Sequence, residues 1–385
     1  MRRLPLERER STWDEWVAAL LTARGRDAAL ASLISRVDGW EPWCAEARAR
    51  RLSGAIWTAI RDEGLQAAIP AGAAARLEGQ WRQSVAASAL VHLDLSQIGA
   101  ALDKEKIPWA LLKGPSVADI LYSDPGSRPM SDIDILIRPH FFRKSLDVLA
   151  EEGWRLREDM IPEYLRITHA VMLKFDPCVA MLEVHWNLLG TVPLPGEDVL
   201  WDGLERMEIA GRAVPVLGAA DSALHLALHA VLHHGLKEAS HLLDIALAFA
   251  RLDREGWGIV VDHATRLNVV EELLAALDAA KRRVGFAAPE QIVRVLKQRR
   301  PGWLRRRATA LALADSGGHA AMTLSRLIMM DGWENKGRYL DFVLMPPREW
   351  LRKVDSGSGG GAYSRRAFSG IGRALVQMFR ARRAS

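Results

Sequence analysis

The sequence has few cysteines and no long apolar segment. Its 385 residues include two cysteines, Cys44 and Cys178, which lie far apart and belong to no Cys-x-x-Cys pair or Cys/His cluster. A disulfide framework and a structural zinc site of that kind are therefore excluded, and a reducing compartment is expected. No stretch approaches the ~18 uninterrupted apolar residues of a spanning helix, and the first ten residues lack the apolar centre of a signal peptide. These absences predict a cytoplasmic protein with no transmembrane segment.

The charge is unevenly distributed along a chain of otherwise ordinary composition. Hydrophobic residues make up 49% and charged residues 26%, which excludes disordered, collagen-like and coiled-coil classes. From Phe286 to the end there are 19 Lys+Arg and 7 Asp+Glu (+12), whereas residues 1–285 hold 33 and 40 (−7). A mildly acidic body therefore carries a basic end.

Periodic segments divide the chain into four regions. Residues 1–104 form an N-terminal helical region, residues 105–200 a compact α/β unit, and residues 201–345 a C-terminal helical domain. Residues 346–385 combine a Gly/Ser linker with a basic, weakly amphipathic tail. We expect a capping box at Thr12–Glu15, strands at 108–112, 132–137, 170–176 and 179–186 (the last two as a hairpin), and helices near 45–64, 73–80, 82–103, 116–122, 141–152, 221–235, 239–252, 257–267 and 269–284.

Two acids on one predicted strand are the strongest chemical signal. Asp132 and Asp134 lie two apart in Asp-Ile-Asp-Ile-Leu-Ile, so both carboxylates project from one strand face and the isoleucines from the other. Packing gives no reason to place two like charges side by side, whereas a divalent cation does. Carboxylate oxygens suit Mg²⁺, which proteins usually share with substrate phosphates. The competing interpretation is a pair of solvated acids on an exposed face.

The neighbouring segments favour the metal interpretation. Lys113-Gly114-Pro115-Ser116 joins a predicted strand to a predicted helix, and the backbone amides of such a turn suit a phosphate. Glu183 is a lone acid in an apolar strand that can pair beside the Asp strand. Three carboxylates on adjacent strands next to a phosphate-binding turn predict a two-metal phosphoryl-transfer site.

This arrangement resembles the nucleotidyltransferase superfamily that includes DNA polymerase β and the aminoglycoside nucleotidyltransferases. The shared features are a strand, a Gly turn and a helix, then Asp-x-Asp on a strand and a third acid on a later strand. The resemblance covers roughly residues 15–280 and implies an α+β fold, with a small mixed-sheet nucleotidyltransferase core between helical regions. More narrowly, the chain resembles the bacterial uncharacterised nucleotidyltransferase family at Leu-Leu-Lys-Gly, Leu121-Tyr122, Arg128 to Leu136, Glu183-Val184-His185-Trp186, His229, His233 and Leu242-Leu243-Asp244.

The resemblance implies a role for each acid. Asp132 and Asp134 would bind the metals, expected to be two Mg²⁺ ions. Glu183 would complete one metal site and help to deprotonate the acceptor. Attack of the acceptor on the α-phosphate of a nucleoside triphosphate would then expel pyrophosphate.

The nucleotide-binding turn departs from the superfamily, which usually has Gly-Gly or Gly-Ser there. In this chain either Ser116 replaces the missing serine or Lys113 supplies a charge instead, with Gly114 permitting close approach. Arg128 precedes the acids, where it either clamps a phosphate or fixes the loop through an ion pair.

Histidines form a second signal. His225, His229 and His233 recur at i, i+4 and i+8 and line one side of the predicted 221–235 helix. A zinc protease is excluded because no Glu follows the first histidine of either pair. Structural zinc, a polar seam against the α/β unit, and a surface that touches nucleotide or acceptor remain as interpretations, the last favoured by the resemblance.

Two further polar residues are candidates for substrate contact. His185 lies two after Glu183 on the same strand face, so it either contacts substrate or lies at the edge of the site. Asp244 is alone in an apolar helix, where it either binds substrate or hydrogen-bonds a helix partner or one of the histidines.

The acceptor is the least determined part of the prediction. Some members of the resembled family accompany biosynthetic clusters for ribosomally made peptides such as lasso peptides, which implies a small molecule or a modified peptide. The basic tail is able to meet an acidic partner or surface and suggests RNA-end addition as an alternative. The acidic body and the lack of an RNA-binding motif argue against a nucleic-acid partner. A non-catalytic nucleotide-binding or scaffold protein is the other alternative, and three intact acids argue against it.

Overall fold

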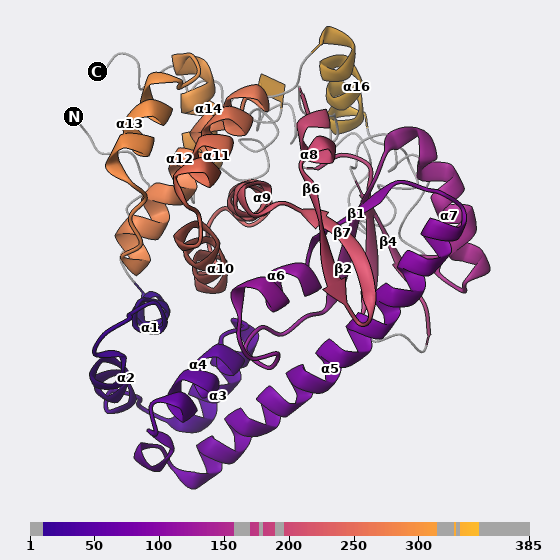
Figure 1. Ribbon diagram of the computed structural model, residues 1–385. Coiled ribbons are helices and arrows are strands. Elements are labelled where there is room, and N and C mark those ends of the chain that lie inside the picture. Colours follow the sequence, from indigo (N-terminus) through magenta and orange to yellow (C-terminus); the bar gives the residue numbers. More distant parts are fainter. Residues whose placement is uncertain are drawn as a thin grey trace.

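The computed structural model describes residues 11–157, 170–176, 180–188, 196–313, 327–328 and 332–345. Within these residues one mixed seven-stranded sheet lies between helical regions (Figure 1). The predicted α+β fold class is therefore confirmed. The Gly/Ser linker and basic tail, residues 346–385, lie outside the described residues.

The N-terminal region is helical, as predicted, with different helix boundaries. Ser11 rather than Thr12 caps α1: its side chain accepts from the Asp14 amide, and the Asp14 carboxylate accepts from the Ser11 amide. The capping box thus lies one residue earlier than predicted, since a serine hydroxyl can make the same bond. The elements are α1 (Thr12–Leu20), α2 (Arg26–Ile34), α3 (Trp40–Ala49), α4 (Ser53–Asp62), the 3-10 helix η1 (Gln66–Ala68) and α5 (Ala71–Lys104).

Helix α5 is one 34-residue helix, where the sequence analysis placed two. Gly79 interrupts the apolar pattern, but a single glycine costs a helix only about 1 kcal/mol. By length and composition α5 could cross a membrane, although a single such helix is weak evidence because core helices pass the same test. Its residues Val91, Leu95 and Ile98 are buried in a core shared with the sheet. The apolar window is 39% buried, and Leu90 and Leu93 are exposed.

The sheet has the strand order β3-β4-β5-β2-β1-β7-β6. β5 runs parallel to β2, and β7 parallel to β1, while the other neighbours are antiparallel. The predicted hairpin is confirmed by the antiparallel pairing of β4 with β5. The strands are β1 (Trp109–Lys113), β2 (Asp132–Ile137), β3 (Arg155–Leu156), β4 (Ala170–Lys174), β5 (Met181–His185), β6 (Leu204–Ile209) and β7 (Arg212–Leu217). The sheet thus continues past residue 200, where the predicted core ended, because β6 and β7 form a hairpin that adds to the β1 edge.

The two faces of the sheet pack against different helices. Ile133, Ile135 and Ile137 are buried in one core with α5 and α7. Leu136, on the face shared with Asp132 and Asp134, belongs to a second core with the C-terminal helices. In Figure 1, α7 and α9 lie on opposite sides of the sheet. The helices joined to the strands are α6 (Pro115–Leu121), the 3-10 helix η2 (Pro139–Phe141), α7 (Phe142–Glu151) and α8 (Asp198–Asp202).

The C-terminal helices surround α9. Helix α9 contacts α10, α11 and α12 and also reaches β1 and β7. Helix α1 packs against α10 and against a π-helix at the end of α12, so the N-terminal region closes onto the C-terminal one. The helices are α9 (Ala219–Leu232), α10 (Ala239–Ala250), α11 (Arg254–Arg266), α12 (Val270–Ala279), the π-helix η4 (Ala280–Val284), α13 (Glu290–Gln298), α14 (Trp303–Leu313) and α16 (Trp333–Leu344).

Candidate functional site

Three neighbouring strands bring charged side chains side by side. The parallel pairing of β2 with β5 sets Asp134 opposite Glu183, as the sequence predicted for the Glu183 strand. On the other side of β2, Lys113 of β1 is the partner of Asp134, after an irregularity in the register. Glu183, Asp134 and Lys113 therefore form a row across β5, β2 and β1. These residues are far apart in sequence, and only the strand order unites them.

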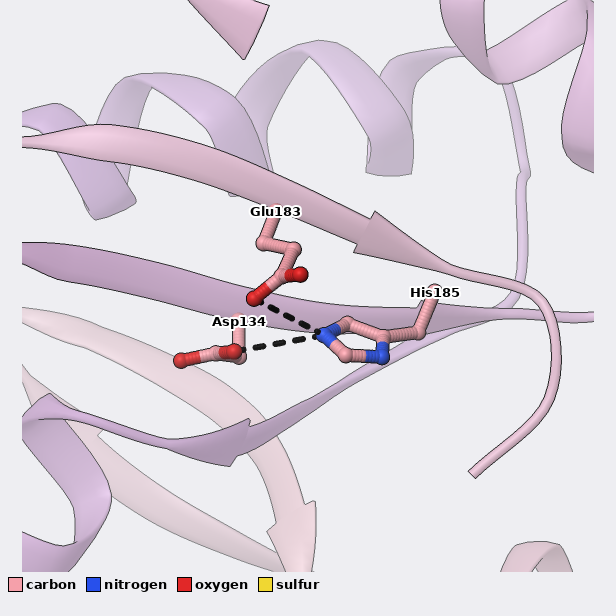
Figure 2. A group of neighbouring side chains, drawn as sticks. All are labelled: Asp134, Glu183 and His185. Atoms are coloured by element: carbon pink, nitrogen blue, oxygen red, sulfur yellow. Dashed lines mark hydrogen bonds and ion pairs between the residues drawn. The ribbon is translucent and has the colours of Figure 1, made fainter. Parts of the chain in front are cut away.

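Asp134 is the centre of this row. Its side chain is fully buried, and its Oδ1 lies 3.0 Å from Lys113 Nζ and 3.2 Å from His185 Nε2. The same His185 nitrogen lies 3.5 Å from Glu183 Oε2, so one imidazole faces both carboxylates (Figure 2). His185 is thus in contact with the acids rather than at the edge of the site.

The electrostatics of the site keep the Glu183 carboxylate ionised. Burial tends to raise the pKa of Glu183, but the hydrogen bond and charge of His185 outweigh it and lower that pKa to about 2. The contacts with the two carboxylates raise the pKa of His185 against the effect of burial. The pKa of Lys113 is also raised, since the attraction of Asp134 and Asp132 exceeds the cost of burial. Cations therefore balance the buried acids.

The donor set fits a divalent cation. Ligand atoms of Asp134, Glu183 and His185 all lie within 4.8 Å of one another. Asp134 Oδ2 is buried without a hydrogen-bond partner among the described residues, so this carboxylate has an oxygen to spare for a metal. Asp132 begins β2 on the same face and is less buried, with Ser131 Oγ 3.3 Å from its Oδ1. Two carboxylates are thus arranged for one cation, and a third lies next to them.

The turn after β1 has a backbone that glycine alone adopts easily. Gly114 has φ +76° and ψ −113°, and a Cβ at this position would lie 2.9 Å from the Asp132 carbonyl oxygen. Pro115 then begins α6, and Ser116 is buried in its first turn. The close approach of this turn to Asp132 is the reason for the glycine.

Arg128 and Asp244, two predicted site residues, are bonded to each other. Arg128 donates from Nε and Nη2 to the Asp244 carboxylate at 3.0–3.2 Å, and Tyr122 Oη donates to the same carboxylate at 2.6 Å. Arg128 Nη1 also lies 3.4 Å from the Gly114 carbonyl oxygen. Asp244 therefore joins α10 to the loop before Asp132, and its partners are Tyr122 and Arg128 rather than the histidines. For Arg128, the geometry corresponds to the loop-fixing ion pair.

The predicted histidines of α9 and its C-cap lie beside Lys113, at the end of the row of charged side chains. His229 Nε2 lies 3.3 Å from Lys113 Nζ, and the ring of His233 stacks on His229 at 4.9 Å. His225 is fully buried, and neither of its ring nitrogens has a hydrogen-bond partner among the described residues. Burial, with the charge of Lys113 next in size, lowers the pKa of His225 to about 3 and that of His229 well below 6.5. Both are therefore neutral at pH 7.

Three residues near these groups escaped the sequence analysis. His234 Nε2 lies 3.1 Å from His229 Nε2, and the rings of His234 and His241 are 4.3 Å apart. Arg51, between α3 and α4, donates from Nη2 to Ser131 Oγ and to the Pro129 carbonyl oxygen, both at 3.1 Å. The density of histidine was a signal: five of the eleven lie between residues 225 and 241. Nothing in the sequence pointed to Arg51.

Comparison with known proteins gives one family match. A family model described as "uncharacterised nucleotidyltransferase" matches residues 37–285. No curated protein matches the chain. Among solved structures, the antibiotic-resistance factor ANT(2'')-Ia is similar over 49% of this chain and 96% of that chain, at 16% identity and a TM-score of 0.34. A likeness at this TM-score carries no argument, whereas the family match includes the whole sheet and every histidine of the cluster.

Proposed function

Because the chain belongs to the uncharacterised nucleotidyltransferase family, we propose that it is a Mg²⁺-dependent enzyme that transfers a nucleoside monophosphate from a nucleoside triphosphate to a hydroxyl or phosphate acceptor. Family membership supports nucleotidyl transfer in general. The observation that carries the finer proposal is the pairing of Asp134 with Glu183 across two parallel strands, with Asp132 on the same face. A site for phosphoryl transfer needs such clustered carboxylates to hold its metal ions.

The burial and contacts of each acid suggest its role in the proposed site. Asp134 and Glu183 would hold one Mg²⁺, and the less buried Asp132 would join Asp134 in holding a second. Bound there, Mg²⁺ would neutralise charge at the transferred phosphate. The low pKa of Glu183, about 2, suits metal ligation better than proton abstraction, since so weak a base takes a proton poorly at neutral pH. His185 orients both carboxylates through its Nε2.

The turn between β1 and α6 receives the nucleotide. Gly114 lets the backbone come close, and Ser116 and Lys113 offer a hydroxyl and a charge beside it. Arg128 acts by fixing the loop that precedes Asp132, because its contacts go to Asp244 and to the Gly114 carbonyl oxygen. The acceptor is a small molecule or a modified peptide, selected by the helical regions on either side of the sheet.

Pyrophosphate release tests the proposal. The protein is incubated with Mg²⁺, radiolabelled nucleoside triphosphates and candidate acceptors, and labelled product and pyrophosphate are measured. Asp134→Asn is expected to lower the rate at least about 100-fold, since bound metal supplies several kcal/mol of stabilisation to the transition state. Asp147→Asn, an exposed acid of α7, is the matched control and should keep full activity. Unchanged activity in Asp134→Asn would contradict the metal assignment.

The two alternatives have their own signatures in the same experiments. An RNA-end transferase would bind RNA with an affinity that falls steeply as salt is raised, because phosphate contacts release counterions. A scaffold would bind no triphosphate and release no pyrophosphate. The proposed enzyme binds the triphosphate and transfers to a non-nucleic acceptor.

A further inference from the structure

We propose that Lys113 and the histidines His229, His234 and His241 form the subsite for the phosphate chain of the nucleotide, and that these three histidines take up protons when the phosphate chain binds. This inference rests on the proposed function, since the phosphate chain is that of the proposed nucleotide. The inference goes beyond the proposed function in two ways. It names residues outside the carboxylate site, and it couples phosphate binding to proton uptake, which nucleotidyl transfer itself does not require.

Position is the first argument for the subsite. Lys113 Nζ lies between the metal-site carboxylate and the histidines, 3.0 Å from Asp134 Oδ1 and 3.3 Å from His229 Nε2. A nucleotide whose α-phosphate is held at Asp134 and Glu183 must place the rest of its phosphate chain beside that site. The imidazole cluster therefore begins one contact from the Asp134 carboxylate, through Lys113.

The ring nitrogens of the cluster lie where they can bind a ligand. His229 Nε2 and His234 Nε2 face each other at 3.1 Å, so when both are neutral only one proton lies between them. His241 stands beside His234, and its Nδ1 is buried without a hydrogen-bond partner among the described residues. Exposure increases from half-buried His229 to exposed His234, so the outer end of the cluster is open to a ligand. Protonation would turn each of these rings into a donor at both nitrogens.

The charges around each ring determine whether the ring is protonated. Burial first, and then Lys113 and neighbouring histidines, disfavour the imidazolium, which keeps the cluster neutral without a ligand; the pKa of His241 is lowered to about 4. An anionic phosphate chain acts in the opposite direction, and favours proton uptake. The charged and titratable groups near the rings are Lys113, His225, His233, His234 and His241 around His229; Lys113, His229, His241, Glu238, Arg51 and Asp132 around His234; and His229, His234, Asp244, Arg128 and Arg51 around His241.

A metal is a poorer occupant of this cluster. Among the described residues, the one group that offers three ligand atoms within 4.8 Å of one another is Asp134, Glu183 and His185. The histidine cluster offers one close pair of nitrogens, with the Lys113 ammonium beside it, and no third ligand atom within the same reach among the described residues. The same ammonium attracts phosphate.

Calorimetry on the full chain tests the coupling. Inorganic tripolyphosphate with Mg²⁺ is titrated in two buffers of different ionisation enthalpy, from pH 6 to 8.5. We expect uptake of up to about one proton near pH 7, so that affinity falls by up to about tenfold per pH unit in the coupled range. His234→Gln should weaken binding by about tenfold at pH 6, the loss expected for one charge-assisted hydrogen bond, and the difference should shrink at pH 8.5. His234 is exposed, so this variant is expected to fold; His140→Gln, an exposed histidine beside α7, is the matched control.

Each outcome decides the proposal. Proton uptake that is reduced in His234→Gln and unchanged in His140→Gln supports it. Three outcomes overturn the proposal: tripolyphosphate binds without proton uptake, proton uptake is unchanged in His234→Gln, or uptake occurs with a nucleoside but not with tripolyphosphate. Failure of the two proposals is distinguishable: binding with proton uptake but no pyrophosphate release overturns the proposed function alone, and transfer activity without proton uptake overturns the subsite alone. Absence of any tripolyphosphate or triphosphate binding overturns both.

Discussion

Asp134 shows how the site holds several charges within a protein interior. One of its oxygens is shared by Lys113 and His185, while the other has no hydrogen-bond partner among the described residues. A buried carboxylate is costly unless it is paired, and here two cationic groups meet that need. Both are drawn to one oxygen, which leaves the second in a position to ligate a metal. The buried charge is therefore paired in the metal-free protein, and in the proposed enzyme the second oxygen would ligate the metal.

Gly114 provides a direct test of how closely the turn approaches Asp132. Gly114→Ala should destabilise the protein by about 1–3 kcal/mol, because φ +76° with ψ −113° strains any side chain and the added Cβ would meet the Asp132 carbonyl oxygen at 2.9 Å. Gly72→Ala is the matched control: it lies in the first turn of α5 with open space around it and should be neutral or stabilising. Denaturant unfolding and pyrophosphate release measure the two effects. Equal stability of the two variants would contradict the role given to Gly114.

Substitution of Asp244 distinguishes a positioning role of this residue from a role in substrate binding. Asp244→Asn removes the charge that Arg128 pairs with and should cost about 2–3 kcal/mol of unfolding free energy, less than a fully buried pair because Arg128 is partly exposed. If Asp244 acts by fixing the loop, the variant loses stability while the KM for the nucleotide changes little. Asp262→Asn, whose partner Arg266 is exposed, should change stability by at most about 0.5 kcal/mol. A large rise in KM at unchanged stability would instead assign Asp244 to the substrate.

At the scale of elements, α1 is held to the π-helix η4 by a buried ion pair. Arg283 donates from Nε and Nη2 to the two oxygens of Asp14, at 2.9 and 2.6 Å, and both side chains are buried. Asp14→Ala should cost about 3–5 kcal/mol, since it leaves the guanidinium buried without its partner. Glu15→Ala, which breaks an exposed pair with Arg36, should cost at most about 1 kcal/mol. Chemical denaturation of both variants compares them, and similar losses would show that the buried pair has no special weight.

The same pair predicts how stability depends on pH. Burial tends to raise the pKa of Asp14, but the bonds from Arg283 and Ser11 outweigh it and lower that pKa below its usual 3.8. A lowered folded-state pKa means that the contribution of Asp14 is fully present above about pH 4 and is lost as pH falls through its folded value. Urea midpoints of the wild type and Asp14→Ala should therefore converge as the solution is acidified below about pH 4. A constant difference between them down to pH 2 would contradict this assignment.

Local patterns in the sequence were enough to predict most elements of the core. Alternation predicted β2 and β5, and the lone Glu183 predicted which strand would lie beside Asp134. The β6–β7 hairpin lies within the region predicted as the C-terminal helical domain; the β6 segment is rich in charge, and its pairing with β7 makes it a strand. Helical spacing placed His229 and missed His234, which lies just after α9 ends at Leu232. The chain turns after His234, where Gly235 and Leu236 adopt positive φ and the Leu236 amide bonds the Ala230 carbonyl oxygen.

At the scale of the whole molecule, contacts of α12 extend beyond the end of the family match. The family match ends at residue 285, yet Glu272 of α12 is fully buried and is bonded to Arg305 Nη2 at 3.0 Å and to Thr309 Oγ1 at 2.8 Å, both in α14. Helices α13 and α14 therefore belong to the folded body, although the family model does not include them. The basic tail, residues 346–385, lies beyond the last described helix and beyond the family match.

Two truncations test this boundary. A chain ending at residue 345 loses nine Lys+Arg and two Asp+Glu, a change of −7 in net charge. We expect it to keep its thermal midpoint and its pyrophosphate release, because the candidate site residues and the contacts described for them lie in residues 11–313. A chain ending at residue 285 removes both partners of Glu272 and should lose at least about 3 kcal/mol of unfolding free energy. Glu272→Gln in the shorter chain should recover part of that loss, since the buried charge would be gone. Loss of transfer in the 345-residue chain would place the tail within the catalytic function, and full stability of the 285-residue chain would show that the family match alone defines the folded unit.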